Sequence, residues 1–319
     1  MSSINYNRGD GVFRTRLEKA IKETGERVRK IKELRSNVFI IYTTRGKYLL
    51  KGFHNRHKLE AQSVLLKKLE DRGFYKTYNF VRDMPTFKYD GEIYAWIEYL
   101  KPKSEKFSFQ TSSNRSKGLY LLEEFHSATS TFYEQIPVNR FDQVEKWEER
   151  LDDFKYNSSI VRKYVKSSYI ESWLDWGKKS LAGLVKYERD LYKEPLCIVH
   201  GDVAHHNFFL KADGSLNIID FDLISKAPPL IDYLQYSNRI MPFLADSKEL
   251  FSYKQLQRYK DNPAFLYALL FPTDIFREWN RIIKDNALKD NRYLHSVWKL
   301  TAGEWKHRTK LYKEIAGML

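Results

Sequence analysis

Polar residues with the types and spacing needed for metal-dependent chemistry are concentrated in one short segment, residues 197–222. Asp213 and Gly214 lie between two apolar runs there and predict a two-residue hairpin turn. In that register Asn207 faces Asp220 at the open end of the hairpin, with Cβ atoms about 4.5–5.5 Å apart. An amide oxygen and a carboxylate at that separation can share a hard cation, and magnesium prefers such ligands.

Asp202 lies on the loop after the apolar run that begins this segment, and Gly201 permits a tight backbone turn before it. Beside a bound metal and phosphate, an aspartate can accept the proton of a hydroxyl group as that group attacks. Each residue alone also has an ordinary interpretation, because Asp and Asn are common in turns. The combination of Asp202, Asn207 and Asp220 around one hairpin favours a catalytic site over a structural loop.

A second pair of candidate residues lies earlier in the chain. Lys51 is placed inside a predicted strand, and Glu60 near the start of the helix that follows. A lysine in such a strand can reach a phosphate oxygen, and a glutamate from the next helix can hold it in place. The alternative is an edge-strand lysine and a glutamate that complements the helix dipole. The segment 197–222 favours the phosphate-binding interpretation.

The elements that must position these residues divide the chain into two predicted domains. Strands are predicted at residues 28–34, 38–42, 48–53, 86–89 and 92–100, and helices at residues 12–21 and 59–69. A polar connector follows at residues 101–116. Later helices are predicted at residues 119–132, 144–156, 169–190 and from Pro229 onward. The pattern predicts an α+β protein, with a small sheet domain at residues 1–100 and a mainly helical domain at residues 101–319.

Composition excludes several other classes of protein. The 319 residues include 42% hydrophobic residues, too many for a disordered chain. No apolar run is long enough to span a membrane, and the polar N-terminus argues against a secretory signal. Cys197 is the one cysteine, which excludes an intramolecular disulfide or a cysteine-based metal site and favours a cytoplasmic location.

The net charge of +14 leaves four interpretations open. It suits nucleic acid, an anionic substrate such as ATP, an acidic partner surface, or a lysine-rich surface that is simply solvated. No zinc-finger spacing and no aromatic RNA-binding signature accompany the charge, so the sequence disfavours nucleic acid as a partner.

The chain resembles the aminoglycoside phosphotransferase/choline kinase family, which has a bilobal protein-kinase-like fold. The family's His-Gly-Asp-x-x-x-x-Asn signature stands at residues 200–207, and its Ile-Asp-Phe/Trp-Asp/Glu signature at residues 219–222. Within the family the chain is most similar to spore-coat-associated kinase-like proteins of spore-forming bacteria. The residues behind that likeness are found at 51–53, 96–99, 125–126 and 229–233.

This resemblance implies an ATP- and magnesium-dependent kinase that phosphorylates a hydroxyl group of an unidentified acceptor. It implies Asp202 as the catalytic base, Asn207 and Asp220 as magnesium ligands, and Lys51 with Glu60 as the residues that hold the ATP phosphates. It further implies that the strand ending at Glu98 and Leu100 binds adenine, and that Asp232 braces the catalytic loop. For Asp232, a position at the start of a helix is an equally good explanation. The implied location is cytoplasmic, with assembly onto the spore coat and spore-coat proteins as partners.

The sequence departs from the family pattern at two places. The predicted tip of the first hairpin, Arg35-Ser36-Asn37, lacks the glycines of a phosphate-covering loop. Ala204 stands where the family often has His or Lys, and His205 or His206 either replaces that residue or packs beside the hairpin. The alternative to an enzyme is therefore a kinase-like scaffold of the spore coat with weak or no activity.

The C-terminal segment gives a prediction about the acceptor. Residues 298–312 read as one helix with an aromatic side and a basic side, the latter including Lys306, Arg308 and Lys310. A basic side near an acceptor site predicts an anionic acceptor or an acidic partner surface. The alternative is a packed amphipathic helix whose charges are only solvated.

Overall fold

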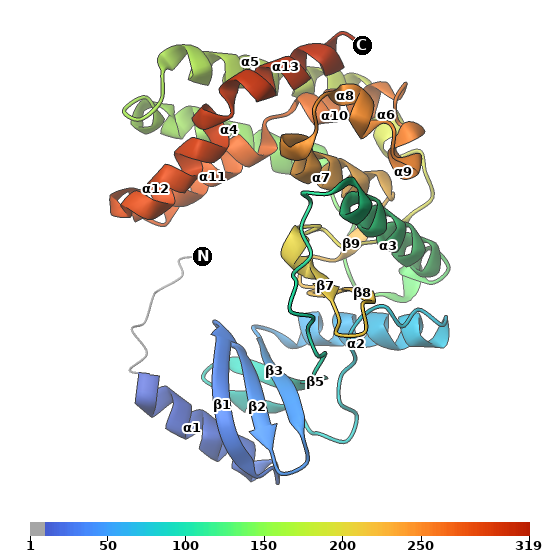
Figure 1. Ribbon diagram of the computed structural model, residues 1–319, viewed down its shortest axis with the longest axis vertical. Coiled ribbons are helices and arrows are strands. Elements are labelled where there is room, and N and C mark those ends of the chain that lie inside the picture. Colours follow the sequence, from blue (N-terminus) through green and yellow to red (C-terminus); the bar gives the residue numbers. More distant parts are fainter. Residues whose placement is uncertain (1–9) are drawn as a thin grey trace. The chain divides into compact units, whose positions relative to one another are not determined.

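The β-branched and aromatic runs before residue 100 form one antiparallel sheet (Figure 1). The computed structural model describes residues 10–319. The sheet has the strand order β1-β2-β3-β5-β4, with bounds β1 (Val28–Arg35), β2 (Val38–Thr43), β3 (Lys47–Phe53), β4 (Phe87–Tyr89) and β5 (Glu92–Glu98). Each strand predicted before residue 100 is present. Lys51 of β3 pairs with Val38 of β2 and Ala95 of β5, at the centre of the sheet.

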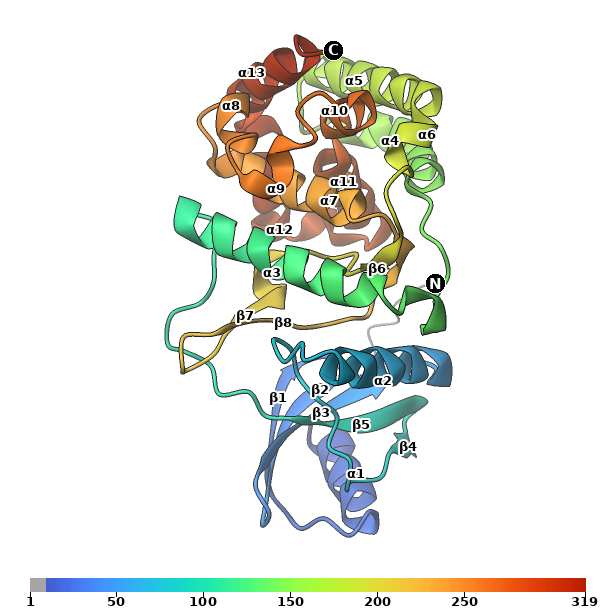
Figure 2. The same ribbon diagram turned by 90° about the vertical axis from the view of Figure 1, so that its right-hand side faces the viewer.

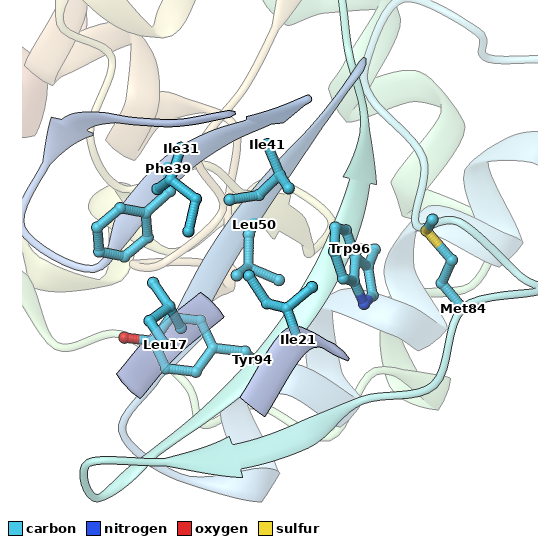
Figure 3. Close-up of a cluster of buried hydrophobic side chains, with 9 residues drawn as sticks. All are labelled: Leu17, Ile21, Ile31, Phe39, Ile41, Leu50, Met84, Tyr94 and Trp96. Carbon is cyan, nitrogen blue, oxygen red and sulfur yellow. The ribbon is translucent and has the colours of Figure 1, made fainter. Parts of the chain in front are cut away.

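Two helices cover this sheet through different sets of side chains. Helix α1 (Asp10–Glu23) contributes Leu17 and Ile21 to a buried cluster with residues from the strands, which Figure 3 shows. Helix α2 (Arg56–Asp71) contributes Leu59 to a second cluster with Phe53 and Ala95. Because successive side chains of a strand point to opposite faces, Lys51 shares the α2 face of the sheet with Phe53 and Ala95.

The chain forms two compact units. The first contains the sheet up to Lys106, together with Glu134–Pro137 and Phe209–Asp222. The second contains Phe107–Tyr133, Val138–Phe208 and Leu223–Leu319. The first unit therefore includes residues 101–106, beyond the domain boundary predicted at residue 100, as well as the segment that carries the second signature.

Hydrogen bonds explain why Phe209–Asp222 packs with the first unit. The amide of Lys103 donates to the carbonyl of Leu210 at 3.0 Å. The Asn217 side chain donates to the carbonyl of Thr77 at 2.8 Å, and the ring of Tyr78 lies 5.7 Å from that of Phe221. These contacts fix the chain on both sides of the hairpin loop, so the residues that follow it are held against the sheet unit.

The second unit is mainly helical (Figures 1 and 2). Its helices are α3 (Ser112–Ser130), α4 (Gln143–Val161), α5 (Ser167–Lys186), α6 (Glu188–Leu191), α7 (Leu230–Ile240), α8 (Ser247–Leu250), α9 (Lys254–Gln257), α10 (Pro263–Leu270), α11 (Thr273–Lys284), α12 (Asn291–Trp298) and α13 (Trp305–Ala316). Strands β6 (Cys197–Val199) and β9 (Ser225–Ala227) pair antiparallel, and α3 packs against β6 and α7. Helix α4 packs between α5 and α11, which brings the start of α11 close to α4.

Three predictions about local structure need correction. Helix α3 begins at Ser112, inside the predicted connector, because the Thr111 side chain caps it by accepting from the amide of Asn114. The segment predicted as one C-terminal helix consists of the end of α12, a π-helical turn at Lys299–Gly303, and α13. The hairpin formed by β7 (Phe208–Leu210) and β8 (Leu216–Ile218) has a loop one residue longer than predicted, closed by a bond from the Lys211 amide to the Ser215 carbonyl.

No helix among residues 10–319 is long and apolar enough to cross a membrane. Residues 1–9, which carry most of the argument against a secretory signal, lie outside the described residues. The observed architecture, an antiparallel sheet unit and a mainly helical unit, confirms the predicted α+β class.

Candidate active site

Lys51 is the centre of a charge cluster in the first unit. Its side chain is only 8% exposed, and its Nζ lies 2.9 Å from Asp220 Oδ1 and 2.5 Å from Asp222 Oδ1. Arg35, at the end of β1, holds the other oxygen of Asp220 at 2.7 Å. The predicted strand position of Lys51 is confirmed, and its ammonium group is paired with two carboxylates of the 219–222 signature.

Asp220 has two unusual properties: an uncommon backbone conformation and a side chain with a lowered pKa. Its φ of 71° lies in the left-handed region, which non-glycine residues rarely adopt and which is typical of strained functional positions. Burial opposes ionisation of the carboxyl group, but the charges and hydrogen bonds of Lys51 and Arg35 outweigh it and hold the pKa of Asp220 well below its usual range. Asp220 is therefore an anion whose oxygens face cations.

Glu60 does not pair with Lys51, contrary to the interpretation that a helix glutamate holds the lysine. It forms an ion pair with Arg56 at 2.9 Å on the exposed side of α2. The residue of α2 that reaches the charge cluster is Gln62, which donates to Asp222 Oδ1 at 2.8 Å and accepts from the hydroxyl of Tyr78 at 2.9 Å. Gln62 lies on the buried stripe of α2 with Leu59 and Leu66, whereas Glu60 is turned away from that stripe.

Asp202 is the centre of a second polar cluster, which lies in the second unit. The Asn207 side-chain amide donates to the carbonyl of Asp202 at 2.8 Å and to its Oδ2 at 3.2 Å. Arg239 of α7 lies 3.2 Å from Asp202 Oδ1. Two residues of the predicted catalytic signature thus contact each other directly, and a cation from a distant part of the sequence joins them.

Asp232 braces the backbone that carries Asp202. The carboxylate, fully buried, accepts from the amide of His200 at 2.7 Å, the amide of Gly201 at 3.0 Å and Nε2 of His126 at 2.8 Å. Burial opposes its ionisation, but the bond and charge of His126, helped by His200 and the Gly201 amide, lower the pKa of Asp232. Although it lies in the first turn of α7, its side chain is used to hold the 200–202 loop.

Gly201 is required by the shape of this loop. Its φ of 77° lies in the left-handed region, and a Cβ placed on it would come within 2.2 Å of the carbonyl oxygen of Leu223. Any side chain at this position would push Leu223 away and move the residue that follows, Asp202. The glycine of the signature therefore allows two backbone segments to approach closely.

The structure places the remaining candidates in separate surroundings. Glu98 ends β5, where its amide donates to the carbonyl of Asn79 at 2.9 Å, and Leu100 is half-buried just beyond it. Ala204 is buried, whereas His205 and His206 are exposed. The part of the His205 ring that is covered lowers the pKa of this residue by desolvation, and the charges of His206 and Arg239 act in the same direction.

The prediction that Asn207 lies opposite Asp220 in the hairpin is wrong. The loop is one residue longer than predicted, which shifts the pairing of the two strands by one residue. Asn207 belongs to the second unit and Asp220 to the first. Their sharing of one cation stays a prediction.

Three residues that contact the predicted site were not identified as candidates from the sequence: Arg35, Gln62 and Arg239. For Gln62 a signal exists, since it is a polar residue on the apolar stripe of an amphipathic helix. Arg35 and Arg239 reach Asp220 and Asp202 over 185 and 37 residues of sequence, and local patterns contain no information on such pairs.

Residues 27–264 match the family described as the phosphotransferase enzyme family. The chain belongs to the phosphotransferase enzyme family. Both signatures and the Lys51 strand lie inside the matched range. Among curated proteins, none matches the sequence.

Solved structures show how far the likeness to known phosphotransferases extends. An aminoglycoside phosphotransferase from Alicyclobacillus acidocaldarius is 18% identical, with a TM-score of 0.62 over 91% of this chain and 92% of that one. The GDP complex of aminoglycoside 2′-phosphotransferase-IIIa is 13% identical, with a TM-score of 0.62 over 95% and 99%. The AMP-bound complex of spectinomycin phosphotransferase is 15% identical, with a TM-score of 0.59 over 89% and 94%. At these identities the likeness establishes the fold, which is protein-kinase-like.

The oxygen donors of the family signatures suit a magnesium ion. In the first unit, Asp220 and Asp222 present carboxylate oxygens that already face cations. In the second, Asn207 donates from Nδ2 to Asp202, so its Oδ1 is not used in that contact. Among residues 10–319, no group of three or more His, Cys, Asp or Glu side chains is arranged to hold a metal by itself. Carboxylate and amide oxygens are of the type that magnesium prefers, and magnesium keeps water and phosphate oxygens among its ligands.

Proposed function

We propose that this member of the phosphotransferase family transfers the γ-phosphoryl group of ATP to a hydroxyl group, with magnesium as cofactor. The observation that carries the proposal is the contact of Lys51 with Asp220 and Asp222, because it joins a buried strand lysine to the acidic signature. The GDP and AMP bound in two similarly folded phosphotransferases support a nucleotide as the ligand of this fold.

Each unit has its own part in the proposed reaction. In the first, Lys51 binds phosphate oxygens, Asp220 faces the metal, and the backbone near Glu98 and Leu100 holds adenine. In the second, Asn207 supplies a metal ligand and Asp202 acts as the base. When bound, magnesium neutralises charge on the phosphate oxygens. Glu60 is not assigned a role, since it pairs with Arg56 on the exposed side of α2.

The proposed step is a direct displacement. The acceptor oxygen forms a bond to the γ-phosphorus, and the bond from that phosphorus to the β,γ-bridging oxygen breaks, so that ADP leaves with the electron pair. The hydroxyl proton passes to the carboxylate of Asp202. Asn207 and Arg239 each hold Asp202 at 3.2 Å, which fixes the direction of its oxygens before the acceptor arrives.

Thermal melting tests the nucleotide part of the proposal. At 100 times Kd, a ligand that binds only the folded protein stabilises it by about 2.7 kcal/mol. We expect MgATP to raise the melting temperature, ATP with a chelator to raise it less, and Lys51→Met to abolish the shift. GTP provides a parallel arm, because one similarly folded protein binds GDP. The absence of a shift with any nucleotide would overturn the proposal.

A kinase-like scaffold without turnover is the alternative function. Ala204 and the glycine-free turn after Arg35 favour it, whereas the contact between Asp202 and Asn207 favours an enzyme. ATP consumption with a panel of hydroxyl compounds distinguishes the two. Assembly onto the spore coat rests on the sequence resemblance alone, and fractionation of sporulating cells tests it.

A further inference from the structure

Basic side chains from three helices of the second unit lie in electrostatic range of one another: Lys146 and Arg150 of α4, Arg239 of α7 and Arg277 of α11. Two of them reach Asp202, since Arg239 lies 3.2 Å from its Oδ1 and Lys146 is in electrostatic range of its carboxylate. The guanidinium group of Arg150 donates to the carbonyl of Thr273 at 3.4 Å and to its hydroxyl. Thr273 is the first residue of α11, and Arg277 lies one turn further along. Lys146 lies one turn before Arg150 on α4, in electrostatic range of Arg277 and Asp202.

The carboxylates near these helices do not balance this charge. Asp274 accepts two hydrogen bonds from Arg308, at 3.1 and 2.5 Å, and is therefore engaged by α13. Glu278 pairs with Arg277 at 3.0 Å and also with Arg281. Within residues 10–319, no carboxylate forms an ion pair with Lys146 or Arg150.

Burial makes this excess of positive charge unfavourable. Burial and the charge of Arg277 lower the pKa of Arg150 to about 10, although the charges of Asp274 and Glu278 oppose the shift. Burial likewise lowers the pKa of Lys146, with Arg150 and Arg277 adding to the effect. The ammonium group of Lys146 lies 4.7 Å from the centre of the Phe141 ring, but neither Lys146 nor Arg150 has a paired anion among the described residues. Partly buried cations without a paired anion are a cost to the fold, and such arrangements are found at sites that bind an anionic ligand.

We propose that the acceptor is a phosphate-bearing alcohol, whose phosphate group binds to Lys146, Arg150 and Arg277 while its hydroxyl group faces Asp202. This inference rests on the proposed kinase function. A phosphate monoester carries roughly −1.5 to −2 charges at neutral pH, and so matches several cations better than a single carboxylate does. Guanidinium groups suit phosphate because they donate two parallel hydrogen bonds to it.

Two of the basic residues that led to the interpretation of the C-terminal helix as the acceptor surface are engaged within the second unit. Arg308 is turned inward onto Asp274, and Lys310 donates to the carbonyl of Ala245 at 2.9 Å. The charge of Arg308 is therefore paired within the fold, whereas Lys310 stays largely exposed. The expectation of an anionic acceptor therefore moves from α13 to the cluster on α4, α7 and α11.

Calorimetric titration of inorganic phosphate into the full chain, at low ionic strength and without phosphate in the buffer, tests the site itself. The test variant is Lys146→Gln/Arg150→Gln. The control is Lys163→Gln/Arg189→Gln, which removes the same two charge types at exposed positions outside the cluster. A charged hydrogen bond contributes about 1.5–3 kcal/mol, so the test variant should bind phosphate at least about tenfold more weakly than the wild type. The control should bind phosphate as the wild type does.

Turnover with matched alcohols tests the identity of the acceptor. We expect ATP-dependent phosphorylation of glycerol 3-phosphate and glucose 6-phosphate in preference to glycerol and glucose, with KM raised in the test variant. Preference for the neutral alcohols would overturn the inference, as would phosphate binding that is absent in the wild type or unchanged in the test variant. In those cases stabilisation by MgATP would still support the kinase function. A different result would separate the two proposals. If the test variant loses phosphate binding and no nucleotide raises the melting temperature of the wild type, the anion site is supported and the kinase function is contradicted.

Discussion

The charge clusters of the two units differ in how their charges are compensated. In the first, Lys51 and Arg35 face Asp220 and Asp222 at 2.5–2.9 Å, so two cations meet two carboxylates. In the second, the cations of α4, α7 and α11 outnumber the carboxylates paired with them, and Lys146 has no carboxylate partner among residues 10–319. A balanced cluster, in which each cation is paired with a carboxylate, stabilises the protein. To bind a ligand, a residue of such a cluster must give up one of its ion pairs. A cluster with excess charge destabilises the protein, and an anionic ligand relieves that cost.

The largest expected effect is on turnover and concerns the second cluster. Replacing the base by Asp202→Asn removes the proton acceptor and should lower turnover by roughly 10²–10⁴-fold. Nucleotide binding should change little, because the proposal places the phosphate contacts at Lys51. Steady-state kinetics with an identified acceptor measures the effect, with Asp213→Asn on the exposed hairpin loop as the control. Full activity of Asp202→Asn would remove Asp202 from the catalytic assignment.

Opening the balanced cluster should give the largest effect on stability. Lys51→Met leaves Asp220 and Asp222 close together without their shared cation, and should lower the free energy of unfolding by roughly 3 kcal/mol. Lys32→Met on the exposed part of β1 removes the same charge and should stay within about 0.5 kcal/mol of the wild type. Urea unfolding of both variants makes the comparison. Equal stability of the two variants would show that the Lys51 cluster adds nothing to the fold.

The lowered pKa of Asp220 in the same cluster predicts that the free energy of unfolding depends on pH. Because the folded-state pKa of Asp220 is lowered, its stabilisation is present above the unfolded-state pKa of about 3.9 and is lost as pH falls toward the folded-state value. Asp220→Asn should therefore cost about 2 kcal/mol at pH 7, and the difference from the wild type should shrink below pH about 4. Denaturant unfolding at several pH values measures it. A difference that is constant between pH 7 and pH 3 would contradict the ion pairing of Asp220.

The sheet and the signature residues could be predicted from sequence because their information is local. Runs of β-branched residues gave the strands, and Asp202 and Asn207 stand at a fixed spacing within one loop. The role of Glu60 could not be assigned correctly in this way. Gln62 lies only two positions further along α2, but it belongs to the buried side of the helix and Glu60 does not. The hairpin loop exceeded the prediction by one residue because Asp213 and Gly214 also suit a longer turn, in which Gly214 adopts a φ of 85°.

The charge balance of the two clusters could not be read from the sequence at all. A net charge of +14 says nothing about where cations lack partners. Arg308 looked like part of a basic surface, yet it is turned onto Asp274. Arg150 was not singled out in the sequence, and packing of α4 against α11 partly buries it in electrostatic range of Arg277 and Arg239. Pairing of this kind depends on tertiary contacts.

The smallest expected effect has the opposite sign to that of Lys51→Met. Lys146 and Arg150 are like charges one turn apart on α4, a spacing that destabilises a helix by about 0.2–0.5 kcal/mol, and burial adds to this. Lys146→Met should therefore raise the free energy of unfolding by about 0.5–1 kcal/mol.

The gain should disappear when phosphate is present, because phosphate stabilises the wild type by binding and stabilises the variant less. Urea unfolding of the two proteins in buffers with and without phosphate, at matched ionic strength, measures both parts, with Lys163→Met as the exposed control. A loss of stability in Lys146→Met without phosphate would mean that the protein itself neutralises this lysine. The contrast between a balanced and an unbalanced cluster would then fail, and with it the reason to expect an anion beside Asp202.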